Sequence, residues 1–289
     1  MIAVLALALI SGTAFAAAPA GVSYESVVID GAAIQVQYYK PAHYNGGPLL
    51  VSFHGLSRNV AGYVDAARPI ADRHGMLIVA PLFDAKRFAY QRYQALGITR
   101  VTRKVTSGDI PVEPRENWTS AIIATLIEHV RTREQRRDLD YYLLGHSAGA
   151  QIANRMAAFA PHTARRIVIA NPSSYVWPTR DARFPYGFGD LPVEMNDDHA
   201  LRRYLAQPLT LLLGTADTAI TADLDVLPQA MQQGAMRYQR GINTYRAAQS
   251  LAQEKGWAFN WRLLEVPDAG HDARRMYGGP QAAAAFASD

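Results

Sequence analysis

"YYLLGHSAGAQIANRMA" spans residues 141–157 and places one serine, Ser147, between two segments of different periodicity. The first four residues form a short apolar run, which is typical of a strand buried on both faces. From Gly149 onward, apolar residues recur at helical spacing. Because Gly145 and Gly149 flank the serine, the stretch predicts a strand, a tight turn and a helix in that order. Ser147 is therefore either an exposed nucleophile or the cap of that helix.

Similar apolar runs occur along the rest of the chain, and segments with helical spacing separate most of them. The runs are Leu49–Phe53, Met76–Ala80, Ile167–Ala170, Thr210–Leu213 and Trp261–Val266. Asn59 is a plausible cap for a helix from Val60, Asn117 for the next helix, and Gly256 ends a helix predicted over Ile242–Lys255. Strands that alternate with helices form βαβ units, so we expect an α/β fold with a mostly parallel central sheet flanked by helices.

The N-terminal part adds an antiparallel element to this sheet. Glu25–Ile29 and Ala33–Tyr39 are β-rich runs, and the Asp30-Gly31 pair between them is a strong hairpin signal. The sequence shows no internal repeat and no low-complexity linker. We therefore expect one domain over residues 19–289, with a lid-like excursion at about 171–206.

Composition excludes several classes of function. The chain has 289 residues, of which 49% are apolar and 19% charged, so a sizeable core is available. It contains no cysteine, which excludes disulfides, thiolate metal sites and a cysteine nucleophile. The net charge of +4 is spread along the chain without a basic stripe, so no nucleic-acid partner is expected. No cofactor or metal is implied, because the acidic and histidine residues lack ligand spacing and "NDDH" at 196–199 reads as a capped helix start.

The first residues have the features of an export signal. Ile2–Ile10 is apolar but too short to span a bilayer, and Ala14-Phe15-Ala16 fits a small-residue cleavage site. The alternative is a frayed apolar tail. Residues 1–18 are therefore predicted to be a signal peptide, which implies a secreted or periplasmic protein without stable membrane insertion.

The candidate site lies where parallel strands end. Ligands of open α/β sheets bind beyond the carboxyl ends of the strands, and Ser147, Asp217 and His271 each follow a predicted strand. A serine hydroxyl needs a base, and the base needs an orienting carboxylate. Gly145-His146-Ser147-Ala148-Gly149 matches G-x-S-x-G in the strand–turn–helix context that a nucleophile requires.

Each partner of Ser147 has an alternative interpretation. Asp217 could serve in a turn or a cap, and Asp223 and Asp225 are nearby rivals for the role of the acid. His271 could be an ordinary loop histidine, although Gly270 beside it and its place after the last strand favour a catalytic role.

An acyl-transfer site also needs two N–H donors for the oxyanion. The backbone N–H of Ala148 is one candidate, and that of Leu56, in the loop after Leu49–Phe53, is the other. His54 is a candidate at the substrate site, where it would brace this loop. The equally plausible alternative for His54 is a histidine packed in the core.

These motifs together resemble the α/β-hydrolase superfamily over nearly the whole mature chain. The resemblance rests on the serine elbow, the "HG" at 54–55, "GTADT" at 214–218 and "AGH" at 269–271. Within the superfamily, residues 53–81 are similar to exported esterases of the polyhydroxybutyrate-depolymerase and feruloyl-esterase group. The resemblance implies a serine esterase mechanism with Ser147, Asp217 and His271 in the catalytic positions.

The substrate wall is predicted from aromatic side chains in the excursion. They are Tyr175, Trp177, Phe184 and Tyr186, with Phe188 nearby. These rings either line an acyl or aromatic pocket or pack on one another inside a folded-back lid.

The sequence thus predicts an exported serine carboxylesterase that acts on a small-molecule or oligomeric ester through an acyl-enzyme. A polyester depolymerase of the polyhydroxyalkanoate type is an alternative. Against it, such enzymes often carry a cysteine after "HG" and several disulfides, whereas this chain has Leu56 and no cysteine. A serine peptidase and a non-catalytic binding protein on the same fold are the remaining alternatives.

Overall fold

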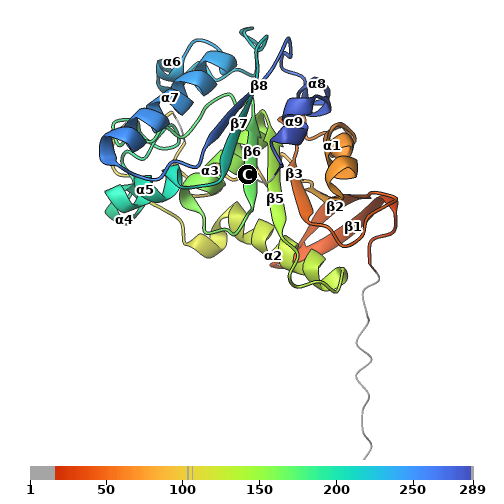
Figure 1. Cartoon of the computed structure of the whole chain (residues 1–289). Helices are drawn as coiled ribbons and strands as arrows, with labels where there is room; N and C mark the ends of the chain where they lie inside the picture. The colour runs from red at the N-terminus through yellow and green to blue at the C-terminus, as the bar shows by residue number, and fades with distance from the viewer. Residues whose placement is uncertain (1–16, 103, 106, 288–289) are drawn as a thin grey trace, which may run out of the picture.

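The computed structural model describes residues 17–102, 104–105 and 107–287 (Figure 1). Apart from Ala17 and Ala18, the predicted signal peptide lies outside the described residues. In the described part of the chain, one sheet contains eight strands in the order β1-β2-β4-β3-β5-β6-β7-β8. The strands are β1 (Gly21–Ile29), β2 (Ala32–Lys40), β3 (Leu49–Phe53), β4 (Leu77–Pro81), β5 (Tyr141–His146), β6 (Arg166–Ala170), β7 (Leu209–Gly214) and β8 (Arg262–Val266).

Strand directions agree with the sequence prediction. β1 pairs with β2 and β2 with β4 in antiparallel fashion, and every pair from β4 to β8 is parallel. The predicted hairpin is confirmed, since Asp30 and Gly31 both have positive φ angles, 49° and 74°, at its tip. Two such residues give a turn whose twist matches that of the paired strands.

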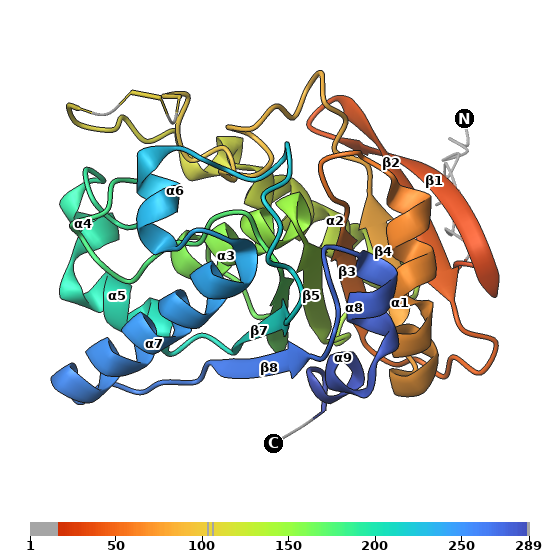
Figure 2. The ribbon, with the colours of Figure 1, turned by 90° about the horizontal axis from the view of Figure 1, so that it is seen from above.

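Helices cover both faces of the sheet (Figure 2). They are α1 (Val60–His74), α2 (Thr119–Arg133), α3 (Ala148–Phe159), α4 (Val193–Asn196), α5 (Asp198–Leu205), α6 (Pro228–Gln233), α7 (Arg237–Lys255), α8 (Ala273–Gly278) and α9 (Pro280–Ala284). Buried residues of α1, α8 and α9 share one hydrophobic cluster with Leu50 and Leu144. Those of α2, α3, α5 and α7 share the other with Val51 and Leu143. Neighbouring residues of one strand therefore enter opposite cores, as the pleat requires.

Two of the three predicted helix-end residues occupy the positions that the sequence indicates. Asn59 caps α1, because its side-chain oxygen accepts a hydrogen bond from the N–H of Gly62 at 3.0 Å. Asn117 does not cap α2, which begins at Thr119 with Trp118 in the cap position and no side-chain cap. Gly256 ends α7 as predicted, with φ at 64°.

α7 begins before the predicted Ile242. Its first residues, Arg237–Gly241, are mostly polar and show no apolar stripe in the sequence, although Arg237 and Arg240 are fully buried in the structure. Apolar periodicity therefore does not detect a helix start whose buried side chains are arginines with polar partners.

The excursion at about 171–206 packs onto the body of the protein. It contains α4 and α5, and its phenylalanines Phe184 and Phe188 contact Phe159 of α3, with ring centroids 5.6 and 4.8 Å apart. The buried guanidinium of Arg155 on α3 donates to the carbonyl oxygens of Ser174 and Pro185. These contacts tie the excursion to α3 along its length.

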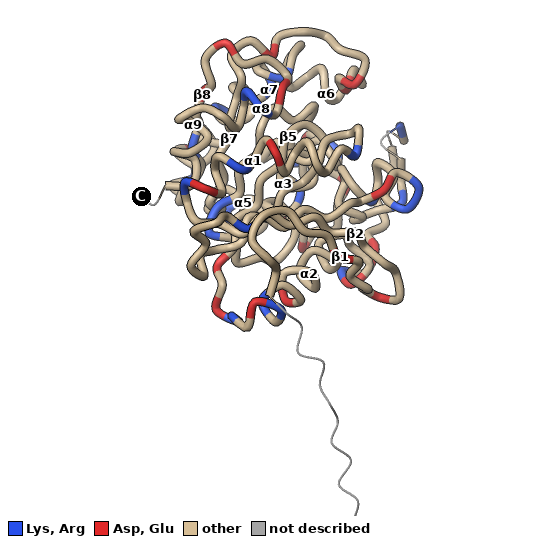
Figure 3. The backbone as a smooth tube through the Cα atoms, turned by 90° about the vertical axis from the view of Figure 1, so that its right-hand side faces the viewer, with Lys and Arg blue, Asp and Glu red and all other residues tan. Residues whose placement is uncertain are grey.

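Charged residues of both signs are interspersed along the described chain, as Figure 3 shows. Among the helices of the described residues, none combines the length and apolarity needed to cross a bilayer.

Candidate active site

The sharp turn after β5 places Ser147 in an unusual backbone conformation. Its φ of 57° and ψ of −120° are sparsely populated for a residue with a side chain, and such strain persists only where the surroundings enforce it. The Ser147 N–H donates to the carbonyl of Ala170 at 3.0 Å, and its carbonyl accepts from the N–H of Ala150 at 3.1 Å. The turn is therefore held from β6 on one side and from α3 on the other.

Both glycines of the motif are required by close backbone contacts. A Cβ on Gly145 would lie 2.1 Å from the carbonyl oxygen of Gly149, and a Cβ on Gly149 would lie 2.3 Å from that of Phe53. The obstructing atoms are backbone, so they cannot move aside as a flexible side chain would. These contacts bring α3 close to β3 and β5 and aim the Ser147 side chain away from the sheet.

His271 lies between Ser147 and Asp217. Its Nδ1 is 2.7 Å from Asp217 Oδ2, and its Nε2 is 3.0 Å from Ser147 Oγ. A carboxylate cannot donate, so Nδ1 carries the proton and Nε2 accepts from the serine hydroxyl. Ser147 occupies the cap position of α3, but its side chain makes no cap hydrogen bond. This arrangement suits proton transfer from the hydroxyl rather than helix capping.

Neither of the two rival acids, Asp223 and Asp225, is the partner of His271 Nδ1. Asp225 is buried and accepts a hydrogen bond from the Tyr186 hydroxyl at 2.8 Å. Asp223 approaches the other ring nitrogen, with 3.8 Å between its Oδ2 and His271 Nε2. Asp217 is thus the aspartate on Nδ1.

A buried asparagine fixes the loop that carries His271. Asn171, which follows β6 with φ at 46°, donates through Nδ2 to the carbonyl of Gly270 at 3.3 Å. Its side-chain oxygen accepts from the N–H of Gly214 at 2.9 Å. Asn171 directly follows the predicted strand Ile167–Ala170, but its bridging contact depends on the order of the strands in the sheet, which the sequence does not give.

A second histidine packs against His271. The rings of His146 and His271 have centroids 4.5 Å apart, and His146 Nδ1 is 3.1 Å from the hydroxyl of Tyr63. Burial lowers the pKa of His146 well below its ordinary value, with a smaller contribution from the charge of His271. His146 is therefore neutral at physiological pH and does not compete with His271 for a proton.

Of the two predicted oxyanion donors, Leu56 lines the same cavity as Ser147, and Ala148 directly follows Ser147 at the start of α3. Within the part of the chain that the structure describes, neither the Leu56 N–H nor the Ala148 N–H donates a hydrogen bond. Ala148 is the first residue of α3, so its N–H points out of the helix start, where the backbone dipoles favour negative charge. Both groups are thus free for a substrate oxygen.

His54 braces the Leu56 loop from inside the core. The Phe83 N–H donates to His54 Nε2 at 3.1 Å, so the ring proton is on Nδ1, which donates to the Gly55 carbonyl at 2.9 Å. The Tyr93 hydroxyl donates to the His54 carbonyl, and the two rings are stacked. Only 1% of the His54 surface is exposed, and burial lowers its pKa to about 4. His54 was expected at the substrate site, but the structure places its side chain in the core, where it supports the Leu56 loop.

A cavity of about 470 Å³, named here the serine cavity, opens above Ser147 and His271. Its wall includes Leu56, Ser57, Tyr63, Asp223, Asp272 and Arg274. These residues come from the loop after β3, the start of α1, the segment after β7 and the start of α8. The sequence prediction missed most of them, because only the strand order brings these segments together.

The predicted aromatic wall does not line this cavity. Tyr175, Phe184 and Tyr186 are buried in the core, with 0%, 4% and 1% of their surface exposed. Trp177 is partly buried and donates through Nε1 to the hydroxyl of Thr244 at 2.8 Å. The structure therefore corrects the pocket-wall prediction in favour of its alternative, a segment that packs on its own aromatic rings.

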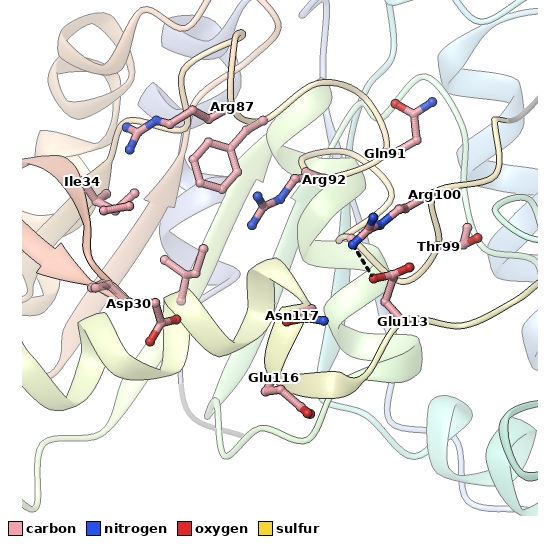
Figure 4. Close-up of a pocket in the computed structure, with 15 residues that line it drawn as sticks. Asp30, Ile34, Arg87, Gln91, Arg92, Thr99, Arg100, Glu113, Glu116 and Asn117 are labelled. Carbon is pink, nitrogen blue, oxygen red and sulfur yellow. Dashed lines mark ion pairs between the residues drawn. The ribbon is translucent and has the colours of Figure 1, made fainter.

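A second hollow of about 560 Å³ lies between the β1–β2 hairpin, residues 87–100 and the start of α2 (Figure 4). Arg100 pairs with Glu113 across it at 3.1 Å, and Arg92 stacks on Phe88. None of the predicted site residues lines it. Among all the described residues, no group of three or more His, Asp or Glu side chains is arranged to hold a metal ion.

Comparisons with known proteins place the chain in a family. No family model and no curated protein matches its sequence. Poly(aspartic acid) hydrolase-1 from Sphingomonas sp. KT-1 is 31% identical, with a TM-score of 0.81 over 91% of this chain and 97% of that one. LpqC, a poly(3-hydroxybutyrate) depolymerase from Bordetella parapertussis, is 33% identical, with a TM-score of 0.80 over 91% of this chain and 90% of that one. The chain belongs to the α/β-hydrolase family.

A structural similarity also extends to a protein of much lower sequence identity. The siderophore hydrolase EstB from Aspergillus nidulans is 14% identical, with a TM-score of 0.54 over 97% of this chain and 96% of that one. At this identity the likeness concerns the fold alone. The predicted resemblance to the α/β hydrolases is confirmed, and the two nearer relatives are named as hydrolases of polymers.

Proposed function

We propose that this α/β hydrolase is a serine carboxylesterase that cleaves carboxylic esters through an acyl-enzyme. The observation that carries the proposal is the position of His271, hydrogen-bonded to Ser147 Oγ on one side and to Asp217 on the other. Such a geometry activates a hydroxyl that is otherwise a weak nucleophile. The free N–H groups of Leu56 and Ala148 support the same reading.

In the proposed reaction Ser147 Oγ attacks the ester carbonyl while its proton moves to His271 Nε2. The N–H groups of Leu56 and Ala148 stabilise the tetrahedral oxyanion, and Asp217 stabilises the imidazolium. His271 then donates the proton to the leaving alcohol, which departs and leaves an ester on Ser147. Water, deprotonated by His271, releases the acid and restores the serine.

The test is hydrolysis of p-nitrophenyl esters of short acids by the wild type and by Ser147→Ala. Removal of the nucleophile should lower kcat by at least about 10³-fold. A fluorophosphonate should label the wild type on Ser147, which intact mass and peptide mapping would show. A Ser147→Ala protein with full activity would refute the proposal. An unlabelled, inactive wild type would favour the non-catalytic alternative.

A polymer substrate is a second candidate, and a specific observation favours it. The serine cavity is open, the excursion at 171–206 does not line it, and Leu56, an apolar residue at the rim, is 51% exposed. An open site admits a bond within a chain as well as a terminal one. Two relatives above 30% identity are named as polymer hydrolases, which supports this candidate.

Matched substrates separate the two candidates. An oligomer and a dimer of 3-hydroxybutyrate carry the same ester bond, so a depolymerase should show a higher kcat/KM on the oligomer. Equal values per bond would favour a small-ester enzyme. Cleavage of a peptide but not of its ester analogue would favour the peptidase alternative.

We also propose that the protein acts outside the cytoplasm, on the basis of residues 1–18. Mass measurement of the protein recovered from the native host would test this. Loss of an N-terminal segment that ends at or just after the Ala14-Phe15-Ala16 site is expected, and a retained Met1 in exported protein would contradict the predicted signal peptide.

A further inference from the structure

A buried arginine links the two carboxylates that flank His271. Arg237, the first residue of α7, is fully buried, and its Nη1 lies 3.7 Å from Asp217 Oδ1. Its Nη2 lies 3.0 Å from Asp223 Oδ1. The imidazole therefore has Asp217 on Nδ1 at 2.7 Å and Asp223 near Nε2 at 3.8 Å. One guanidinium bridges both acids.

Asp223 is held just beyond hydrogen-bonding distance of the imidazole. Its Oδ1 accepts from the hydroxyl of Thr221, and that hydroxyl accepts from Arg237 Nη1 at 3.0 Å. Its Oδ2 faces His271 Nε2 at 3.8 Å, too far for a hydrogen bond. Nε2 thus remains available to Ser147 Oγ at 3.0 Å.

The carboxylates of Asp217 and Asp223 and the guanidinium of Arg237 are the charged groups nearest His271. Partial burial raises the pKa of Asp223, but the Thr221 hydroxyl and the Arg237 charge outweigh burial, and the net shift is downward. Asp223 is therefore ionised at neutral pH. Two carboxylates and one guanidinium leave one net negative charge around a neutral His271, and protonation of His271 cancels it.

Other charged or titratable groups also lie around His271. His146 of β5 stacks on the ring but is neutral, since burial lowers its pKa well below the ordinary range. At the start of α8, Asp272 and Arg274 line the serine cavity with opposite charges. The carboxylate that faces Nε2 directly is Asp223.

We propose that Asp223 stabilises the imidazolium formed by His271, and that Arg237 is a positioning residue that keeps Asp223 from capturing the Nε2 proton. The inference rests on the proposed esterase function. In each half-reaction the proton passes from an attacking oxygen to Nε2 and then to a departing oxygen. An Asp223 free to accept a hydrogen bond from Nε2–H would hold that proton and deprive the leaving group of its donor.

The first test is the pH dependence of kcat/KM for a p-nitrophenyl ester. Asp223→Asn removes the charge at constant shape, so the apparent pKa of the acid limb should fall by about half a unit to one unit. The plateau value should fall about 3- to 10-fold, since the imidazolium loses a stabilising charge. An acid limb that stays within about 0.2 unit of the wild type would overturn the role of Asp223.

The second test concerns the restraint by Arg237. Arg237→Met frees Asp223, so the acid limb should move upward by about one unit and kcat/KM at pH 7 should fall at least about 10-fold. Adding Asp223→Asn to Arg237→Met should recover part of the activity. A double variant no more active than Arg237→Met would overturn the positioning role. If Arg237→Met does not fold, Arg237→Lys with and without Asp223→Asn gives the same comparison with the charge retained.

Arg240 offers a matched control one turn further along α7. It is equally buried, but its guanidinium donates to the carbonyls of Gly234 and Ser173 and to no carboxylate in the described chain. Arg240→Met should lower the melting temperature and leave the acid limb in place. A shift of the acid limb in this control would overturn the inference by showing that any buried cation moves the profile. Full activity of Ser147→Ala would instead refute the proposed function itself.

Discussion

His54 should make the protein sensitive to mild acid. Its Nε2 accepts the Phe83 N–H, and burial lowers its pKa from 6.5 to about 4. The unfolded chain therefore binds a proton at a higher pH than the folded protein does. The stability that comes from the neutral ring is complete above pH 6.5 and decreases as the pH falls toward 4. At pH 5 the loss is about 1.5 × 1.36, or about 2 kcal/mol, and the limit at lower pH is about 3.4 kcal/mol.

The variant His54→Gln isolates this contribution. Its side-chain oxygen still accepts the Phe83 N–H but does not titrate, so we expect a loss of about 1–2 kcal/mol at pH 7.5 from imperfect packing. The difference between wild type and variant should then shrink or reverse toward pH 5. Urea unfolding at pH 7.5, 6.5, 5.5 and 5.0 measures both free energies of unfolding. All other titratable groups are common to the two proteins, so the comparison isolates the ring of His54. Parallel pH curves for the two would refute the assignment of acid sensitivity to His54.

Three further substitutions test the site. Gly149→Ala places a Cβ 2.3 Å from the Phe53 carbonyl oxygen and should destabilise the fold by about 2–4 kcal/mol in urea unfolding, so an unchanged midpoint would contradict the geometry. Asp217→Asn should lower kcat about 10⁴-fold with little change in melting temperature, and near-normal kcat would exclude Asp217 as the acid. Asn171→Ala removes the hydrogen bond to the His271 loop and should lower kcat about 10-fold with a much smaller change in KM. An effect on KM alone would contradict a role in orienting His271.

The parts of the site that follow directly on a strand were accessible from the sequence. Ser147, Asp217 and His271 each occupy the first loop beyond a predicted apolar strand, and parallel strands bring those loops to one edge. The strands before Ser147 and Asp217 are buried, whereas β8, which precedes His271, is mostly half-buried. The hairpin was accessible for a similar reason, because the Asp-Gly pair at its tip determines both the turn and the strand pairing. In these cases a short local pattern fixes the three-dimensional outcome.

The remaining parts depend on contacts between distant segments. An aromatic-rich stretch has the same composition whether its rings face a cavity or a helix, and here Phe184 and Phe188 pack against Phe159. Arg237 lies in a polar stretch, and its burial depends on two aspartates supplied by another loop. The periodicity of a sequence indicates which residues share a face of a helix or strand, but not which segment of the chain packs against that face.

The separation between the excursion at 171–206 and the serine cavity affects how this protein can be altered. The cavity wall includes Arg274, an exposed residue, and Leu56, whose side chain is half exposed. Substitutions at exposed positions seldom change stability by more than about 0.5 kcal/mol. A library at these rim positions can therefore sample new substrate preferences while the aromatic core beneath α3 keeps the scaffold intact.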